Sequence, residues 1–127
     1  MQIFWHGFTC VRIEATYGDT QSTLVTDPYE SNRGLRFPRT LKPEIVALSK
    51  TEEKAFKLDA FQSEPFVIST PGEFEVQGIF VYAIPTEKKD EKDRGKIMYR
   101  FEAEDISVGF IGNMHRVLTE EEVERLG

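Results

Sequence analysis

The chain has 127 residues, of which 39% are apolar and ten are phenylalanine, a composition that suits one globular domain with a substantial core. With 16 basic and 22 acidic residues its formal net charge is −6, which disfavours nucleic acid and anionic membranes, because such partners require clustered Lys and Arg. No stretch approaches the roughly 20 apolar residues that span a bilayer. The first residues lack the pattern of a signal peptide, and the single cysteine, Cys10, cannot form an internal disulfide. We therefore expect a cytoplasmic protein.

The first part of the chain alternates between apolar and polar residues in short runs, which is typical of strands. Asp27-Pro28 ends one of these runs, since proline cannot donate to a sheet. Residues 29–43, with Asn32-Arg33-Gly34 and two prolines, predict an irregular loop. Strands are expected over residues 2–6, 8–15, 22–26 and 44–48.

The hydrophobic period changes after Ser49. Ala55, Phe56 and Ala60 share one side of a predicted helix over residues 50–61. Ser49-Lys50-Thr51-Glu52 fits a capping box that would start this helix, with Glu52 bonded to the Ser49 amide.

The second part of the chain again predicts short strands, then a helix. The polar segment over residues 86–94, TEKKDEKDR, is expected to be an exposed loop. Thr119 and Glu122 form a capping box, with Leu118 and Val123 as its hydrophobic staple, so a helix should start at Thr119. Strands are expected over residues 65–69, 73–76, 79–84, 96–103 and 107–111.

The expected elements, about eight strands and two helices, indicate an α+β domain. Short turns between strand neighbours favour a mixed, largely antiparallel sheet with helices on one face. Two helices would leave an apolar face of this sheet uncovered.

Several stretches, in order and spacing, resemble the N-terminal half of the metallo-β-lactamase-fold Zn-dependent hydrolases, in particular the small metal-dependent hydrolases of the ascorbate-phosphate lactonase type. The resemblance covers residues 1–127 as a single domain, and it implies half of an αββα sandwich with a metal site at the edge between two sheets. The stretches are WHGFTCVRIE (5–14), LVTDPY (24–29), PEIVALS (43–49), STPGEFEVQGIFVYAIPT (69–86), DRGK (93–96) and GNMHRVLTEEEVERLG (112–127).

The zinc ligands that the resemblance implies are replaced in this sequence. The family's His-x-His-x-Asp-His motif follows a Ser or Thr, here Ser49. The bridging Asp of the family's Gly-Asp motif is Asn113, and a further metal-binding His is replaced by Lys88 or Lys89. The family's last ligand His lies in the C-terminal half, and the four positions of the main motif hold Lys50, Glu52, Lys54 and Ala55. We expect no catalytic, cofactor-binding or metal-binding residue among them, because amides and cations do not hold Zn²⁺.

The remaining candidate groups are His6 and His115, the two histidines of the chain, together with Cys10 and Asp27. As zinc ligands the histidines would need such partners, and the alternative is two solvated or hydrogen-bonded side chains. Cys10 is a candidate nucleophile, but its place on an alternating strand favours a small buried side chain.

The first hypothesis for the function is therefore a non-catalytic metallo-β-lactamase-like module without a cofactor. It would self-associate as a homodimer through the uncovered sheet face, or bind a partner or small ligand. The alternative is a divergent metal-dependent hydrolase, with zinc, of small phosphate esters or lactones, which rests on the resemblance alone. A third hypothesis is an interaction module that pairs with an intact hydrolase paralogue.

Overall fold

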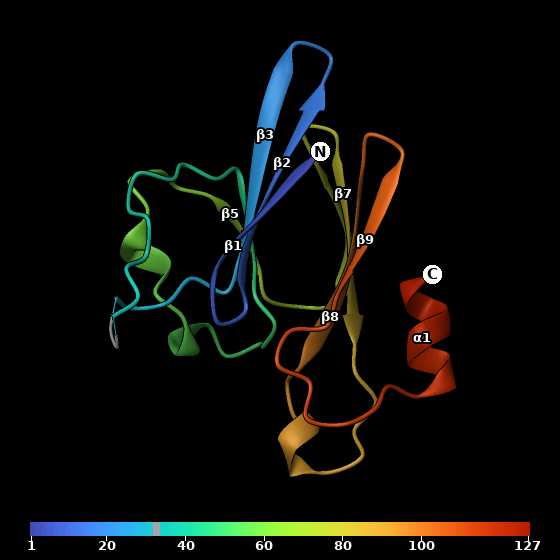
Figure 1. Cartoon of the computed structure of the whole chain (residues 1–127). Helices are drawn as coiled ribbons and strands as arrows, with labels where there is room; N and C mark the ends of the chain where they lie inside the picture. The colour runs from blue at the N-terminus through green and yellow to red at the C-terminus, as the bar shows by residue number, and fades with distance from the viewer. Residues whose placement is uncertain (32–33) are drawn as a thin grey trace.

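Two sheets that face each other make up the body of the molecule in the computed structural model, which describes residues 1–31 and 34–127 (Figure 1). In the first sheet β1, β2 and β3 pair antiparallel, whereas β3, β4 and β5 pair parallel. All pairs of the second sheet are antiparallel. In sheet order, the strands of the first sheet are β1 (Gln2–Gly7), β2 (Cys10–Tyr17), β3 (Thr20–Thr26), β4 (Ile45–Ala47) and β5 (Phe66–Ile68). Those of the second sheet are β6 (Gly72–Val76), β7 (Ile79–Pro85), β8 (Ile97–Ala103) and β9 (Ile106–Phe110).

The predicted α+β class, half of an αββα sandwich with mixed, largely antiparallel strands, is confirmed. The hydrophobic pattern did not indicate that the strands divide into two sheets. Period-2 alternation shows which side of a strand is buried, but not which sheet the strand joins.

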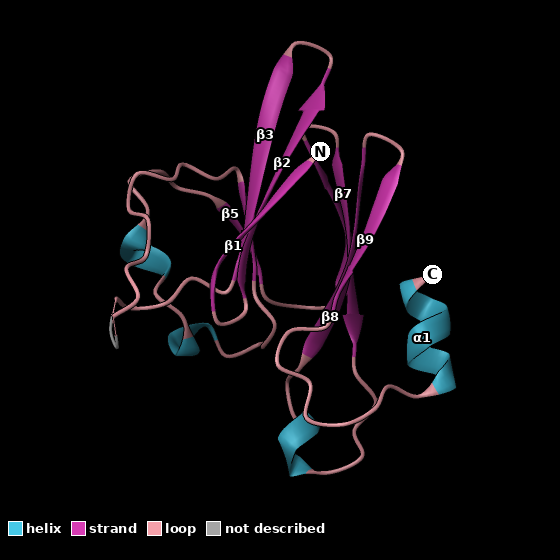
Figure 2. Cartoon of the chain, in the orientation of Figure 1, coloured by secondary structure: helices cyan, strands magenta, loops and turns pink. Residues whose placement is uncertain are grey.

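The main core lies between the two sheets (Figure 2). Ile13, Leu24 and Ile45 of the first sheet are at most 1% exposed. They belong to one cluster with Tyr99 and Phe101 of β8, whose rings stack 5.4 Å apart. Burying each such side chain contributes about 1.5–3 kcal/mol, so this layer holds the sheets together.

A second apolar cluster covers the outer face of the first sheet. Val25, Val46 and Leu48 point to this side and are fully buried. Phe37 and Phe61, from the connections around β4, pack edge to face over them. These connections therefore cover the outer face of the first sheet, as a packed helix would.

The predicted helix over residues 50–61 is wrong. The segment forms two single 3-10 turns, η1 (Glu53–Ala55) and η2 (Leu58–Ala60). Glu52 is the N-cap residue of η1, but its side chain makes no capping hydrogen bond. The Ser49 amide and hydroxyl both donate to Asp27 instead of capping a helix. Because a tertiary partner takes the capping groups, the capping box expected at Ser49 does not form.

The polar segment over residues 86–94 is not merely an exposed loop. It contains the 3-10 turn η3 (Glu91–Asp93), closed by a capping box between Asp90 and Asp93. Asp93 is buried and accepts the amides of Lys89 and Asp90 at 2.7 and 3.0 Å. The charge pattern indicated solvation, but the backbone of the turn encloses one carboxylate.

The C-terminal helix α1 (Glu120–Leu126) is confirmed, with Thr119 as its N-cap in the predicted capping box with Glu122. It packs on the outer face of the second sheet next to β8 (Figure 1). Val123, expected in the hydrophobic staple, remains 55% exposed. Within residues 1–31 and 34–127, no helix is long and apolar enough to cross a membrane.

The expected irregular loop over residues 29–43 is free of regular helix and strand wherever it is described. Asn32 and Arg33, named in that expectation, lie outside the described residues.

Candidate functional site

Three chain segments that are far apart in the sequence meet at one end of the sandwich. The first follows β4 and runs beside the segment that leads into β8: the Thr51 amide donates to the Gly95 carbonyl at 2.8 Å, and the Ile97 amide to the Ser49 carbonyl at 2.9 Å. The third segment follows β9. Its Gly112 has a φ of +60° and lies so close to Ser49 that a Cβ there would be 2.8 Å from the Ser49 Cβ. A glycine is therefore required for this close approach.

Asp27 joins two of the loops at this end of the sandwich. It is 3% exposed, and its carboxylate accepts the Thr9 hydroxyl at 2.6 Å, the Ser49 amide at 2.8 Å and the Ser49 hydroxyl at 2.7 Å. Burial raises the pKa of Asp27, while the hydrogen bonds from Thr9 and Ser49 and the charge of Lys50 act in the opposite direction. The residue supports the loops, and its oxygens are already used.

The family ligand positions lie at or near this junction but offer no set of metal-binding atoms. Lys50 forms an isolated bridge with Lys96, so two cationic residues lie side by side. Asn113 lies across from them, and its main-chain carbonyl accepts the Lys96 ammonium at 3.0 Å. The other positions are exposed: Glu52, Lys54, Ala55, Lys88 and Lys89.

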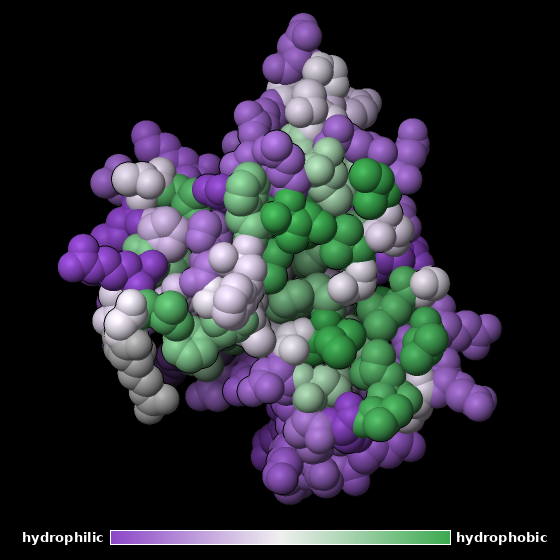
Figure 3. Space-filling model, in the orientation of Figure 1, coloured by the Kyte–Doolittle hydropathy of each residue, from purple (hydrophilic) through white to green (hydrophobic). Residues whose placement is uncertain are grey.

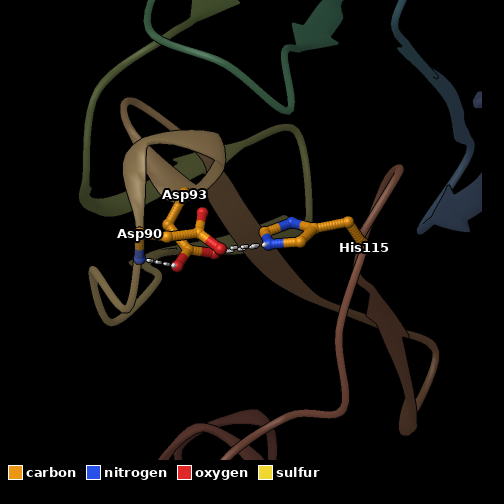
Figure 4. Close-up of side chains that lie close together, drawn as sticks. All are labelled: Asp90, Asp93 and His115. Carbon is orange, nitrogen blue, oxygen red and sulfur yellow. Dashed lines mark hydrogen bonds and ion pairs between the residues drawn. The ribbon is translucent and has the colours of Figure 1, made fainter.

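One group of potential metal ligands is nevertheless present beside the junction, among the described residues. Asp90, Asp93 and His115 place their ligand atoms within 4.8 Å of one another (Figure 4). His115 Nε2 lies 3.4 Å from Asp90 Oδ2 and 3.8 Å from Asp93 Oδ1. Separations of this size are compatible with a shared tetrahedral ion, so the chemistry of the donors decides whether the group fits zinc.

The hydrogen bonds of His115 oppose a metal ion. Lys96 Nζ lies 3.1 Å from His115 Nδ1, and an ammonium only donates, so Nδ1 must accept. In the neutral ring the proton therefore sits on Nε2, facing the carboxylates. A zinc ligand needs the reverse arrangement, with Nε2 free and Nδ1 donating to an acceptor.

Asp93 is also committed to other partners. Arg116 Nε donates to its Oδ1 at 3.1 Å, and the same guanidinium forms two 2.9 Å contacts with Glu122. Burial alone would raise the pKa of Asp93, but the backbone amides and Arg116 outweigh it and lower this pKa. Since Arg116 is bonded to Asp93 and Lys96 donates to His115 Nδ1, the residues present do not fit zinc.

The other sequence candidates lie outside this group. Tyr29 donates its hydroxyl to the His6 carbonyl, and burial followed by the charge of Arg12 lowers the pKa of the His6 imidazole. Cys10 is fully buried, as expected, and burial followed by the charge of Asp27 raises the pKa of its thiol to about 12. This shift disfavours the thiolate, the form that acts as a nucleophile and as a metal ligand.

Sequence reasoning missed four participants: Asp90, Asp93, Lys96 and Arg116. A signal was available for two of them, since Asp90-x-x-Asp93 has the spacing of a capping box with an acidic cap. Lys96 is the last residue of the stretch DRGK. Its partner across the site is His115, which lies 19 residues further along the chain. No local pattern predicts that pairing.

Comparison with known proteins agrees with the observed fold. Residues 2–127 match the beta-lactamase superfamily domain. A crystal structure from Thermotoga maritima, described as a Zn-dependent hydrolase of the metallo-beta-lactamase superfamily, is 29% identical and superposes with a TM-score of 0.76. The match covers 98% of this chain but 56% of that one, so the chain spans little more than half the length of this relative. A search of curated proteins gives no match.

Proposed function

The chain belongs to the metallo-β-lactamase superfamily, and from this membership we propose that it is a non-catalytic member that acts as a binding or assembly module. The supporting observation is the position of Lys96, whose ammonium contacts both the Asn113 carbonyl and His115 Nδ1. A positive charge therefore lies beside Lys50 and Asn113, two of the positions at which the family resemblance implies metal ligands.

The scaffold around the site supports the same proposal. Asp27, Thr9 and Ser49 form a complete hydrogen-bonded network that holds the loops in place. This network needs no metal to satisfy its buried carboxylate, because three donors already do so. These hydrogen bonds therefore stabilise the loop conformations without a metal ion, although the family ligand positions are replaced.

A zinc titration of the purified chain tests the proposal. We expect no zinc binding tighter than a Kd of about 10 µM by calorimetry, because binding would have to displace a proton and two cations. Lys96→Met removes the donor to Nδ1, lets the ring adopt the other tautomer, and should tighten zinc binding at least about tenfold. Adding His115→Ala to Lys96→Met should abolish that gain.

The alternative, a divergent zinc hydrolase of small phosphate esters or lactones, is favoured by one observation, the convergence of Asp90, Asp93 and His115. It makes the opposite prediction for the same titration. Submicromolar zinc binding by the unmodified chain, lost in His115→Ala and accompanied by ester hydrolysis, would overturn the non-catalytic proposal.

A further inference from the structure

The sandwich is open along one side, the seam between the edge strands β1 and β9. Ile3 of β1 lies opposite Ile13, a core residue, and Ile106 of β9 lies opposite Ala103, another core residue. Residues opposite each other in a pair of strands project to the same side, so these side chains point between the sheets. They are nevertheless 54% and 47% exposed. Trp5, which also faces inward, is 74% exposed.

The exposed apolar side chains gather on one surface. Figure 3 shows them on the side of the molecule that carries β1 and β9. The inward-facing residues of the two edge strands, with their neighbour on β2, are Ile3, Trp5, Val11, Ile106, Val108 and Phe110.

The opposite side of the sandwich is closed by the chain itself. A short turn connects β5 to β6, and the Phe66 and Phe74 rings pack 5.7 Å apart across it. β6 also carries Glu73 and Glu75, the kind of charge that protects an edge strand from pairing. By contrast, β1 and β9 read QIFWHG and ISVGF and contain no Lys, Arg, Asp, Glu or Pro.

The total surface of the chain is larger than its mass predicts. The chain exposes 7699 Å², whereas a folded monomer of 14.6 kDa exposes about 6,900 Å². The excess of about 800 Å² equals one partner's share of a standard-size protein interface.

The strand directions favour a second copy of this chain as the partner. The Met1 amino group lies 2.6 Å from the carboxylate of Glu104, in the turn between β8 and β9. β1 and β9 therefore start at the same end of the molecule and run in the same direction. A two-fold axis that lies in the seam and runs parallel to the strands keeps that direction, so β1 of each protomer would pair parallel with the partner's β9.

We propose that this chain forms a two-fold symmetric dimer through the β1–β9 seam, in which each sheet continues into the opposite sheet of the partner. The proposal rests on the proposed function, because it names the partner of the module, and it places the contact at the seam rather than on the uncovered sheet face expected from the sequence. Pairing both edges satisfies their free backbone groups, and the two sets of inward-facing side chains close the core.

Sedimentation equilibrium of the 127-residue chain tests the dimer, with two matched variants. Ile106→Lys places an ammonium in the seam and should raise the dimer Kd at least about tenfold, because burial of an unpaired charge opposes association. Phe66→Lys is the control: Phe66 also faces inward on an edge strand and is 49% exposed, but it lies on the closed side. Its Kd should stay within about threefold of the unmodified value.

Amide hydrogen exchange of the unmodified chain provides a second readout that needs no variant. On dilution below the Kd, the amides of β1 and β9 should lose protection while those of β3 and β4 keep it. A chain that stays monomeric up to about 100 µM, a dimer unaffected by Ile106→Lys, or association only with a different polypeptide would overturn the proposal. A metal-free monomer would refute the dimer but leave the non-catalytic function standing, whereas a zinc-loaded dimer would do the reverse.

Discussion

Asp27 shows how a single buried residue can hold together loops that are far apart in the sequence. Its φ of +41° is one that Asp tolerates better than most residues, and this backbone turns the carboxylate toward Thr9 and Ser49. Three donors reach it in a buried environment. Asp27 therefore fixes the conformation of the segment after β4. The helix that the periodicity of residues 50–61 favours does not form.

The first prediction at the residue scale concerns Asp27→Ala. The substitution leaves the Ser49 amide and two hydroxyls without their acceptor, and we expect it to lower the free energy of unfolding by about 2–4 kcal/mol. Asp27→Asn keeps an acceptor for the amide, and the hydroxyls can rotate to accept from its NH2 group, so its cost should stay within about 1 kcal/mol. Urea denaturation at neutral pH measures both.

The pH dependence of the unfolding free energy separates the effect of the Asp27 charge from that of the size of its side chain. Burial raises the pKa of Asp27 in the folded state above its value in the unfolded state. The stability that this shift contributes is therefore fully present below the unfolded pKa and is lost as pH rises through the folded pKa. Asp27→Asn should remove this decline. Equal pH slopes for the two proteins would show that the carboxylate is not desolvated as described.

At the scale of elements, the short helix α1 is held by charge as well as by its cap. Glu122 is 1% exposed, and it accepts the amides of Thr119 and Glu87 at 2.9 and 2.8 Å in addition to Arg116. Arg116 also donates to the Glu87 carbonyl at 2.7 Å. These contacts tie the helix start to the segment that precedes η3.

The corresponding prediction is an acid-sensitive attachment of α1. The hydrogen bond from Arg116 is the largest cause that lowers the pKa of Glu122, to about 2. The stability it contributes is present above the ordinary value of 4.5 and is lost as pH falls toward 2. Glu122→Gln should therefore lower the melting temperature at pH 7 and flatten its fall between these two pH values.

Glu121→Gln is the matched control for that experiment. Glu121 lies on the same helix, is exposed and forms an ion pair with Arg125, one helical turn away. Such exposed pairs contribute little, so the melting temperature and its pH profile should remain close to those of the unmodified chain. If both variants behaved alike, the attachment of α1 would not depend on the Glu122 charge.

The three capping boxes show how far sequence reasoning reaches. The Thr119–Glu122 pattern formed as predicted, because the further contacts of these two residues with Glu87 and Arg116 leave both capping hydrogen bonds in place. The Ser49–Glu52 pattern did not form, because Asp27, 22 residues earlier, takes Ser49. The Asp90–Asp93 box was missed among the charges of its segment. Local patterns thus predicted the strands and one helix, whereas long-range partners decided the site.

At the scale of the whole molecule, the chain has the fold of about half of a family member. The family resemblance predicted the α+β half sandwich, but not the Lys96–His115 contact, nor the division of these strands into two sheets that close the core on one side and leave a seam on the other. The proposed assembly role rests on the uncharged edge strands, and the proposed loss of catalysis on the Lys96 ammonium beside His115.

Native mass spectrometry of the 127-residue chain, incubated with excess zinc and then exchanged into volatile buffer, tests this account most directly, because it reads metal content and assembly together. The account predicts a dimer whose mass contains no zinc. A chain that retains one or two zinc ions, and loses them in His115→Ala, would contradict it and identify Asp90, Asp93 and His115 as a working metal site.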